Sequence, residues 1–136
     1  MNITATPGAE RDLEALFRAD QAAWRIVVAF LEELDGSAEA ITGLSRDTEV
    51  RLGRFRLNVK HWQAARKNND NLSRIRILDS PATGYRIFFG HDWRTDCVAI
   101  LAVLSKHDGD LIYETSSIPG RRITNEWREI TGGRDT

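Results

Sequence analysis

Polar and apolar residues alternate most clearly between Asn71 and Lys106. Three runs rich in β-branched and aromatic residues are separated there by turn-forming groups, and they cover Ser73–Leu78, Tyr85–Gly90 and Cys97–Leu104. These runs predict three short strands, and the short links between them favour an antiparallel meander. The third run is apolar at nearly every position, so we expect a central strand that is covered on both faces.

The first of these strands has two chemically different faces. Strand side chains alternate in direction, so Arg74 and Arg76 lie together on one face. Ile75 and Ile77 lie on the other face. The predicted sheet therefore has a face that carries cations and an apolar face that needs a covering helix.

The N-terminal part of the chain predicts a strand and then a helix. Residues Met1–Thr6 form a short β-branched run, which we interpret as a first strand. From Glu10 to Leu34 apolar residues recur at spacings of three and four, the pattern of one amphipathic helix that ends before Gly36. We expect this helix to cover the apolar face of the sheet.

The segments on either side of the three strands have weaker patterns. Ser37–Leu52 is interpreted as a linker with a helical turn at Ala38–Gly43. The spacing of Phe55, Val59 and Trp62 among basic residues predicts a second, basic helix. After the strands, the composition of His107–Gly120 predicts a loop, and the spacing of Ile123, Trp127 and Ile130 predicts a short final helix.

These elements indicate the fold class and the number of domains. The sequence predicts an α+β fold in which a small twisted antiparallel sheet packs against N-terminal helices, with a short C-terminal helix. At 136 residues the chain is most simply one domain, residues 1–136, with a single hydrophobic core.

The charge distribution adds a hypothesis about ligands. The formal net charge is −1, but residues 1–50 hold 4 basic and 10 acidic side chains, and residues 51–106 hold 11 basic and 4 acidic ones. A local excess of this kind suits phosphate and nucleic acid. The alternative is a plain solvated face whose arginines pair with Asp79, Asp92 or Asp96.

Several classes of chemistry lack support in the sequence. The one cysteine, Cys97, lies in an apolar run and is interpreted as a small buried hydrophobe. The histidines are scattered without metal-ligand spacing, and no glycine-rich phosphate loop or dinucleotide motif is found. We therefore expect no metal and no cofactor. The longest apolar run, Ile26–Leu31, is too short to span a bilayer, and no signal peptide is evident, so we expect a cytoplasmic protein.

Short motifs in the strand region resemble a known family. Gly84-Tyr85-Arg86-Ile87 resembles the glycine-tyrosine-arginine entry to the central strands of the RelE/ParE superfamily, the toxins of bacterial type II toxin–antitoxin systems. Val98–Leu104 followed by Lys106 resembles the family's strand that ends in basic residues, with His107 in the second basic position. Tyr113 has the spacing of the C-terminal tyrosine in RelE-like ribonucleases. The predicted element order is also similar.

The resemblance implies an activity and a set of site residues. It implies a metal-independent endoribonuclease, an mRNA interferase that cleaves translated mRNA at the ribosome. Arg86 and Lys106 would stabilise charge on the scissile phosphate, because guanidinium and ammonium groups bind phosphate oxygens. His107 would act as acid or base, and Tyr113 would stack on a base or relay a proton. Arg74 and Arg76 fall where the family places RNA-binding residues.

The resemblance also implies partners, and it leaves alternatives open. The partners would be a cognate antitoxin, RNA and the ribosome, with no membrane and no small-molecule cofactor. One alternative is a non-catalytic inhibitor or binding protein of the same fold, for example one that binds gyrase or only its antitoxin. Another is a structural or phage-related protein that shares only the topology. For the residues themselves the alternative is that Arg74, Arg76 and Arg86 are ordinary solvent-facing strand residues, and His107 and Tyr113 ordinary loop residues.

Overall fold

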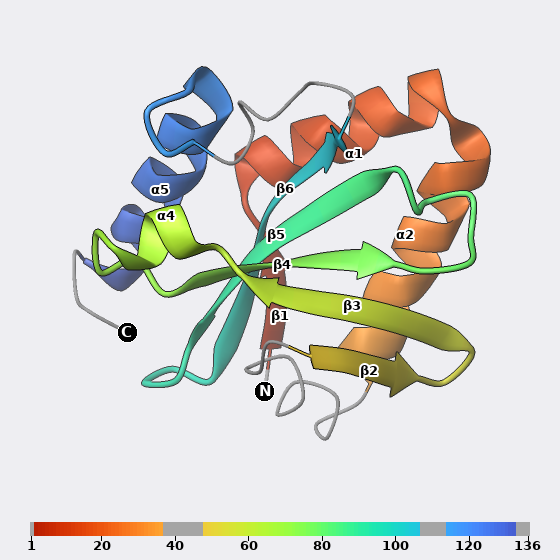
Figure 1. Ribbon diagram of the computed structural model, residues 1–136, viewed down its shortest axis with the longest axis horizontal. Helices are drawn as coiled ribbons and strands as arrows, with labels where there is room; N and C mark the ends of the chain where they lie inside the picture. The colour runs from red at the N-terminus through yellow and green to blue at the C-terminus, as the bar shows by residue number, and fades with distance from the viewer. Residues whose placement is uncertain (1, 37–47, 107–113, 133–136) are drawn as a thin grey trace.

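A mixed sheet runs through the protein, and helices cover parts of both faces (Figure 1). The computed structural model describes residues 2–36, 48–106 and 114–132. In chain order its elements are β1 (Asn2–Ala5), α1 (Pro7–Ala19), α2 (Gln21–Asp35), β2 (Thr48–Leu52), β3 (Phe55–His61), α4 (Gln63–Arg66), β4 (Leu72–Ile77), β5 (Tyr85–Asp92), β6 (Cys97–Ser105) and α5 (Ile118–Thr131). The α+β class is as expected.

The six strands of the described residues lie in the order β1-β6-β5-β4-β3-β2. Strands β2 to β6 form an antiparallel meander, which confirms the three predicted strands and their pairing. Strand β1 instead runs parallel to β6, with Ile3 opposite Val98. The expectation of a purely antiparallel sheet is therefore wrong. Strand β6 lies between two neighbours and is buried on both faces, as its apolar sequence predicts.

The expectation of one helix over Glu10–Leu34 is also wrong, because the helix is interrupted at Asp20 and the segment forms two helices. This residue has extended backbone angles (φ −156°, ψ 87°), and its carboxylate caps α2 by accepting a hydrogen bond from the Ala23 N–H at 3.0 Å. The apolar spacing continues across the break, so periodicity alone does not reveal it. The first helix begins earlier than expected, with Thr6 as its cap.

The predicted linker and the predicted basic helix are replaced by a hairpin. The end of the linker is strand β2, and most of the expected helix is strand β3. The two strands are joined through Gly53, whose φ of +55° suits glycine. In β3 the buried residues alternate as Phe55, Leu57 and Val59, the period of a strand. Of the expected helix only the short α4 remains, and Ala38–Gly43 lies outside the described residues.

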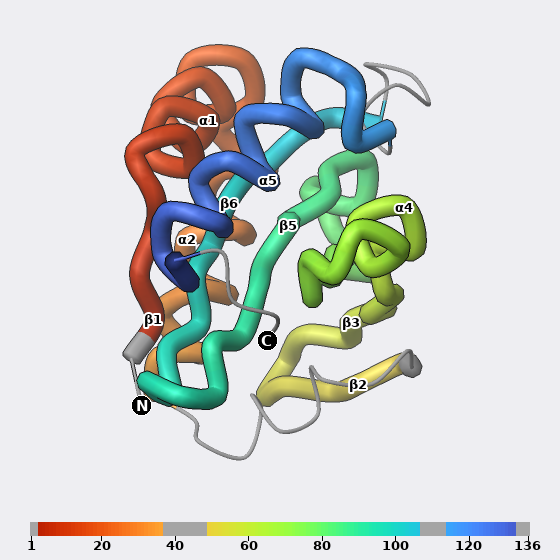
Figure 2. The backbone as a smooth tube through the Cα atoms, turned by 90° about the vertical axis from the view of Figure 1, so that its left-hand side faces the viewer, coloured from red at the N-terminus to blue at the C-terminus, as the bar shows by residue number. Residues whose placement is uncertain are grey.

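Two apolar clusters lie on opposite faces of the sheet. On one face Ile75 and Ile77 belong to the cluster that includes Phe30 of α2. On the other face Trp62 and Trp127 form a second cluster with residues of β5 and β6. The side view in Figure 2 shows α1 and α2 on one side of the sheet and α4 on the other. The N-terminal helices thus cover the face opposite Arg74 and Arg76, as expected.

The final helix is confirmed, and it is longer than predicted. Ser117 caps α5 by accepting a hydrogen bond from the Gly120 N–H at 3.0 Å, so the helix begins at Ile118, before the predicted end of the loop at Gly120. Residues 107–113 of that loop lie outside the described part of the chain. Helix α5 packs closely on β5, where a Cβ added to Gly90 would lie 2.5 Å from Cζ3 of Trp127. An ion pair between Arg128 and Asp70 (2.7 Å) fixes its far end.

Candidate functional site

Four cations gather on the face of the sheet that α1 and α2 do not cover. They surround a depression of about 140 Å³, here called the basic hollow, which is lined by Asn58, Lys60, Arg74, Arg76 and Arg86. These residues come from three adjacent strands, β3, β4 and β5. The sheet itself therefore forms the floor of the hollow.

Strand register explains why these side chains meet. Asn58 is opposite Arg76, and Lys60 is opposite Arg74. Ile75 pairs with Ile87, and the strands are antiparallel, so Arg76 of β4 lies opposite Arg86 of β5. The side chains of this second pair point to the other face of the sheet, away from the two isoleucines. Arg76 and Arg86 therefore stand next to each other. The hollow consists of two short rows of polar side chains across neighbouring strands.

A wall of aromatic residues limits the hollow at one end. Phe88 lies opposite Arg74, and its ring packs edge-on against Trp62 with the ring centroids 5.1 Å apart. Both aromatic residues are fully buried in the cluster under α5. Trp62 is therefore a core residue and does not present a stacking surface to a ligand.

Three of the four cations of the hollow have no carboxylate partner among the described residues. Within the described part of the chain, Lys60, Arg76 and Arg86 take part in no ion pair. Arg56 on the same face of β3 is different, since its guanidinium lies 2.8 Å from Glu49 and 2.9 Å from Asp79. On a plain solvated face we would expect the arginines to pair with nearby carboxylates, as Arg56 does. The hollow instead keeps its positive charge.

Two arginines of the hollow differ in how their guanidinium groups are held. Nη1 of Arg86 donates to the carbonyl oxygens of Thr83 (2.9 Å) and Tyr85 (3.1 Å), and these bonds fix its guanidinium. Nε of Arg76 is buried and has no hydrogen-bond partner among the described residues. Buried donors are almost always hydrogen bonded in folded proteins. Nε of Arg122 and Nε1 of Trp127 are in the same condition outside the hollow.

The structure brings together three of the six predicted site residues, Arg74, Arg76 and Arg86. Lys106 is exposed at the end of β6, where its N–H donates to the carbonyl oxygen of Gly84 at 2.9 Å, and it does not line the hollow. His107 and Tyr113 lie outside the described residues.

Sequence reasoning missed Asn58 and Lys60, because β3 was assigned as a helix. The signal that could have found them is the strand-like alternation of Phe55, Leu57 and Val59 directly after the turn at Gly53. If Phe55–His61 is interpreted as a strand, Asn58 and Lys60 lie together on its polar face.

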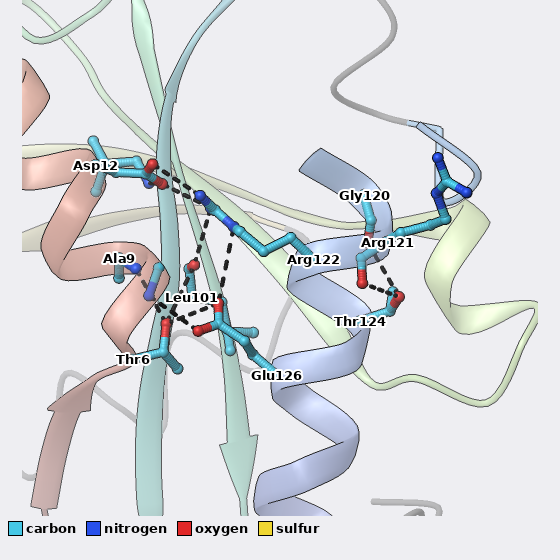
Figure 3. Close-up of polar contacts among 11 residues, drawn as sticks. Thr6, Ala9, Asp12, Leu101, Gly120, Arg121, Arg122, Thr124 and Glu126 are labelled. Atoms are coloured by element: carbon cyan, nitrogen blue, oxygen red, sulfur yellow. Dashed lines mark hydrogen bonds and ion pairs between the residues drawn. The ribbon is translucent and has the colours of Figure 1, made fainter. Parts of the chain in front are cut away.

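A second polar cluster lies between α5, α1 and β6 (Figure 3). Arg122 donates to both carboxylate oxygens of Asp12, at 2.9 and 2.8 Å, and Asp12 also accepts from the Val103 N–H at 3.0 Å. Glu126 accepts hydrogen bonds from the Thr6 hydroxyl at 3.2 Å and the Gly8 N–H at 3.0 Å. These contacts connect the helix to the sheet, so we interpret the cluster as structural.

The same cluster has a clear electrostatic signature. Hydrogen bonds to Asp12 are the largest cause that raises the pKa of Arg122 above its ordinary value, and burial opposes the rise. Hydrogen bonds to Asp70 likewise raise the pKa of Arg128. Both pKa shifts reflect the ion pairs through which α5 docks on the rest of the protein.

Two further features are absent from residues 2–36, 48–106 and 114–132. There, no group of three or more His, Cys, Asp or Glu side chains is placed to hold a metal ion. Within the same ranges, no helix has both the length and the apolar character needed to cross a bilayer.

Comparisons with family models, curated proteins and solved structures return no match to this chain. The chemistry of the basic hollow and the motifs around Arg86 are the observations that bear on function.

Proposed function

We propose that the basic hollow binds a phosphate group of RNA, and that the protein is the toxin of a toxin–antitoxin pair. The observation that carries the proposal is the set of cations Lys60, Arg76 and Arg86, which share one hollow without a carboxylate partner in the described residues. Grouping like charges is unfavourable unless an anion binds between them. The motifs around Arg86 give the resemblance to RelE/ParE toxins.

The proposed reaction is metal-independent cleavage of translated mRNA at the ribosome. The ribose 2′-oxygen attacks the adjacent phosphorus and loses its proton to a base, while the 5′-oxygen leaves and takes a proton from an acid. The products are a 2′,3′-cyclic phosphate and a 5′-hydroxyl end. Arg76 and Arg86 stabilise the charge that develops on the phosphate oxygens. In this proposal His107 and Tyr113 supply proton transfer and base stacking, and Lys106 adds positive charge.

One observation favours a second candidate function, a non-catalytic binding protein. The described residues that line the hollow are cations and one amide, without an imidazole or a carboxylate that could move a proton. By themselves they bind and stabilise charge. On this alternative the hollow holds an acidic segment of a partner, such as gyrase or the antitoxin.

The proposed antitoxin inhibits the protein by covering the hollow. A helix or an extended tail with acidic side chains would pair with Lys60, Arg76 and Arg86 and exclude RNA. We expect expression of this chain alone to arrest growth, and co-expression with the product of the adjacent gene to relieve the arrest. Harmless expression at high level would contradict the toxin proposal.

Ribosome-dependent mapping of mRNA cleavage tests the enzymatic proposal. Wild type is compared with Arg86→Ala and with Arg25→Ala, a matched variant that removes an exposed arginine from α2 on the opposite side of the sheet. We expect Arg86→Ala to lower cleavage by about a hundredfold or more, since one preorganised charge-stabilising donor is lost, and Arg25→Ala to cleave normally. Equal cleavage by both variants would remove Arg86 from the mechanism. Growth arrest without cleavage by any of the three would favour the non-catalytic alternative.

A further inference from the structure

Along β3, and at Phe88 of β5, the unpaired cations of the hollow do not continue as a track in the described part of the chain. Proteins that follow a single strand place cations along a groove. Here the next cation on the same face of β3, Arg56, is paired with Glu49 and Asp79. At the other end the buried ring of Phe88, packed against Trp62, closes the row. The hollow therefore suits one phosphate group better than a length of backbone.

The number of donors exceeds what an internal phosphodiester can use. An internal phosphodiester has one negative charge and two free oxygens, whereas a terminal phosphate carries about −1.5 to −2 charges and three acceptor oxygens. Four cations and the amide of Asn58 line the hollow. Among the described residues, the Asn58 amide and the buried Nε of Arg76 have no hydrogen-bond partner. A third oxygen would engage the Asn58 amide, and a second negative charge would be balanced by the unpaired cations of the hollow.

We propose that the hollow selects a terminal phosphate monoester at an RNA end over an internal phosphodiester. The inference rests on the proposed function, because it assumes that the hollow is a phosphate site for RNA. It is also compatible with catalysis, since the phosphate of the proposed transition state gains negative charge as the 2′-oxygen attacks. A site that prefers the more highly charged phosphate stabilises that transition state more than the bound substrate.

The test compares oligonucleotides that differ only at their ends. A short 2′-O-methyl oligoribonucleotide, which lacks the attacking hydroxyl, is prepared with hydroxyl ends, a 5′-phosphate, a 3′-phosphate, or a 5′-phosphate capped as its methyl diester. The methyl cap keeps the phosphate but removes one charge and one free oxygen. Affinities are measured by fluorescence anisotropy at constant ionic strength, because binding to phosphate depends on salt.

We expect one terminal phosphate to raise affinity by roughly tenfold or more, the change expected for an added charge-assisted hydrogen bond. The methyl cap should remove that gain, and comparison of the 5′ and 3′ forms identifies the preferred end. Equal affinity for capped and uncapped forms would overturn the inference and leave the proposed RNA binding intact. No binding of any oligonucleotide would overturn both.

Variants of the protein test whether the preference for a terminal phosphate comes from the hollow. Lys60→Gln and Arg76→Gln should each reduce the ratio of affinities between uncapped and capped forms by several-fold. Arg25→Gln, with the same loss of charge on α2, should leave the ratio unchanged. Lys60 is exposed, so its variant remains informative even if Arg76→Gln folds poorly. An unchanged ratio in both hollow variants would place the terminal phosphate elsewhere and overturn the inference.

Discussion

Arg76 on β4 and Arg86 on β5 are cross-strand neighbours, and both line the same hollow. Like charges directly opposite each other on neighbouring strands destabilise a sheet. We therefore expect phosphate to raise the melting temperature of the wild type more than chloride does at the same ionic strength. The extra rise should be lost in Arg76→Gln, and that variant should not be less stable than the wild type without phosphate. Differential scanning fluorimetry measures both effects, and an equal response to the two salts would argue against an anion site.

Arg86 and Arg56 should separate ligand binding from stability. Arg86→Ala removes a ligand-facing cation, so RNA affinity should fall by at least about tenfold. Arg56→Ala removes an exposed arginine that already pairs with Glu49 and Asp79, so RNA affinity should stay close to that of the wild type. Arg56→Ala should lower the unfolding free energy by about 0–1 kcal/mol, the usual range for exposed ion pairs. Titration with labelled RNA and urea denaturation measure the two quantities. Loss of RNA affinity in Arg56→Ala would mean that the binding surface extends beyond the hollow.

Asp12 should be important for stability and not for RNA binding. Asp12→Ala leaves the guanidinium of Arg122 and the Val103 N–H without their carboxylate acceptor. We expect the unfolding free energy to fall by about 2–4 kcal/mol, because breaking one side of a partly buried charged pair leaves the other side unpaired. Glu14→Ala is a matched control on the same helix, since Glu14 forms only an exposed pair with Arg18. Equal urea midpoints for the two variants would show that the Asp12 cluster does not hold α5 in place.

Gly90 should tolerate no side chain while Trp127 is present. A Cβ at Gly90 would lie 2.5 Å from the Trp127 ring, so Gly90→Ala should lower the unfolding free energy by about 1–3 kcal/mol. Gly84→Ala is the control, because a Cβ there meets nothing within 4 Å. A double-mutant cycle with Trp127→Leu should show a favourable coupling, since the smaller side chain makes room for the methyl group. A coupling free energy of zero would mean that α5 and β5 shift apart in Gly90→Ala and relieve the contact even with Trp127 in place.

The sequence predicted the strand region well because two signals agreed there. In β4 the alternation of arginine and isoleucine fixed both the element and its orientation, and β6 was recognisable from its continuous apolar run. Both signals are local. They therefore placed Arg74 and Arg76 on one face before their neighbours were known, whereas Arg86 was singled out by the resemblance.

Two local ambiguities account for the errors. Phe55, Val59 and Trp62 fit a helix by spacing, yet Phe55, Leu57 and Val59 also fit a strand, and tertiary pairing with β4 selected the strand. The expected helix Glu10–Leu34 ran through Asp20, although the side chain of Asp20 caps α2 and the residue ends α1. The parallel pairing of β1 could not be predicted from local pattern, because its partner strand lies far along the chain.

That distant pairing determines the order in which the protein can fold. Thr6, at the end of β1, contacts Leu101 across a separation of 95 residues. A chain is synthesised from its N-terminus, so β1, α1 and α2 leave the ribosome long before β6 is available. Closing so long a loop costs entropy that only the completed sheet can repay. The first strand made is therefore among the last to be paired, and nascent chains that lack β6 should remain sensitive to protease while complete chains become resistant.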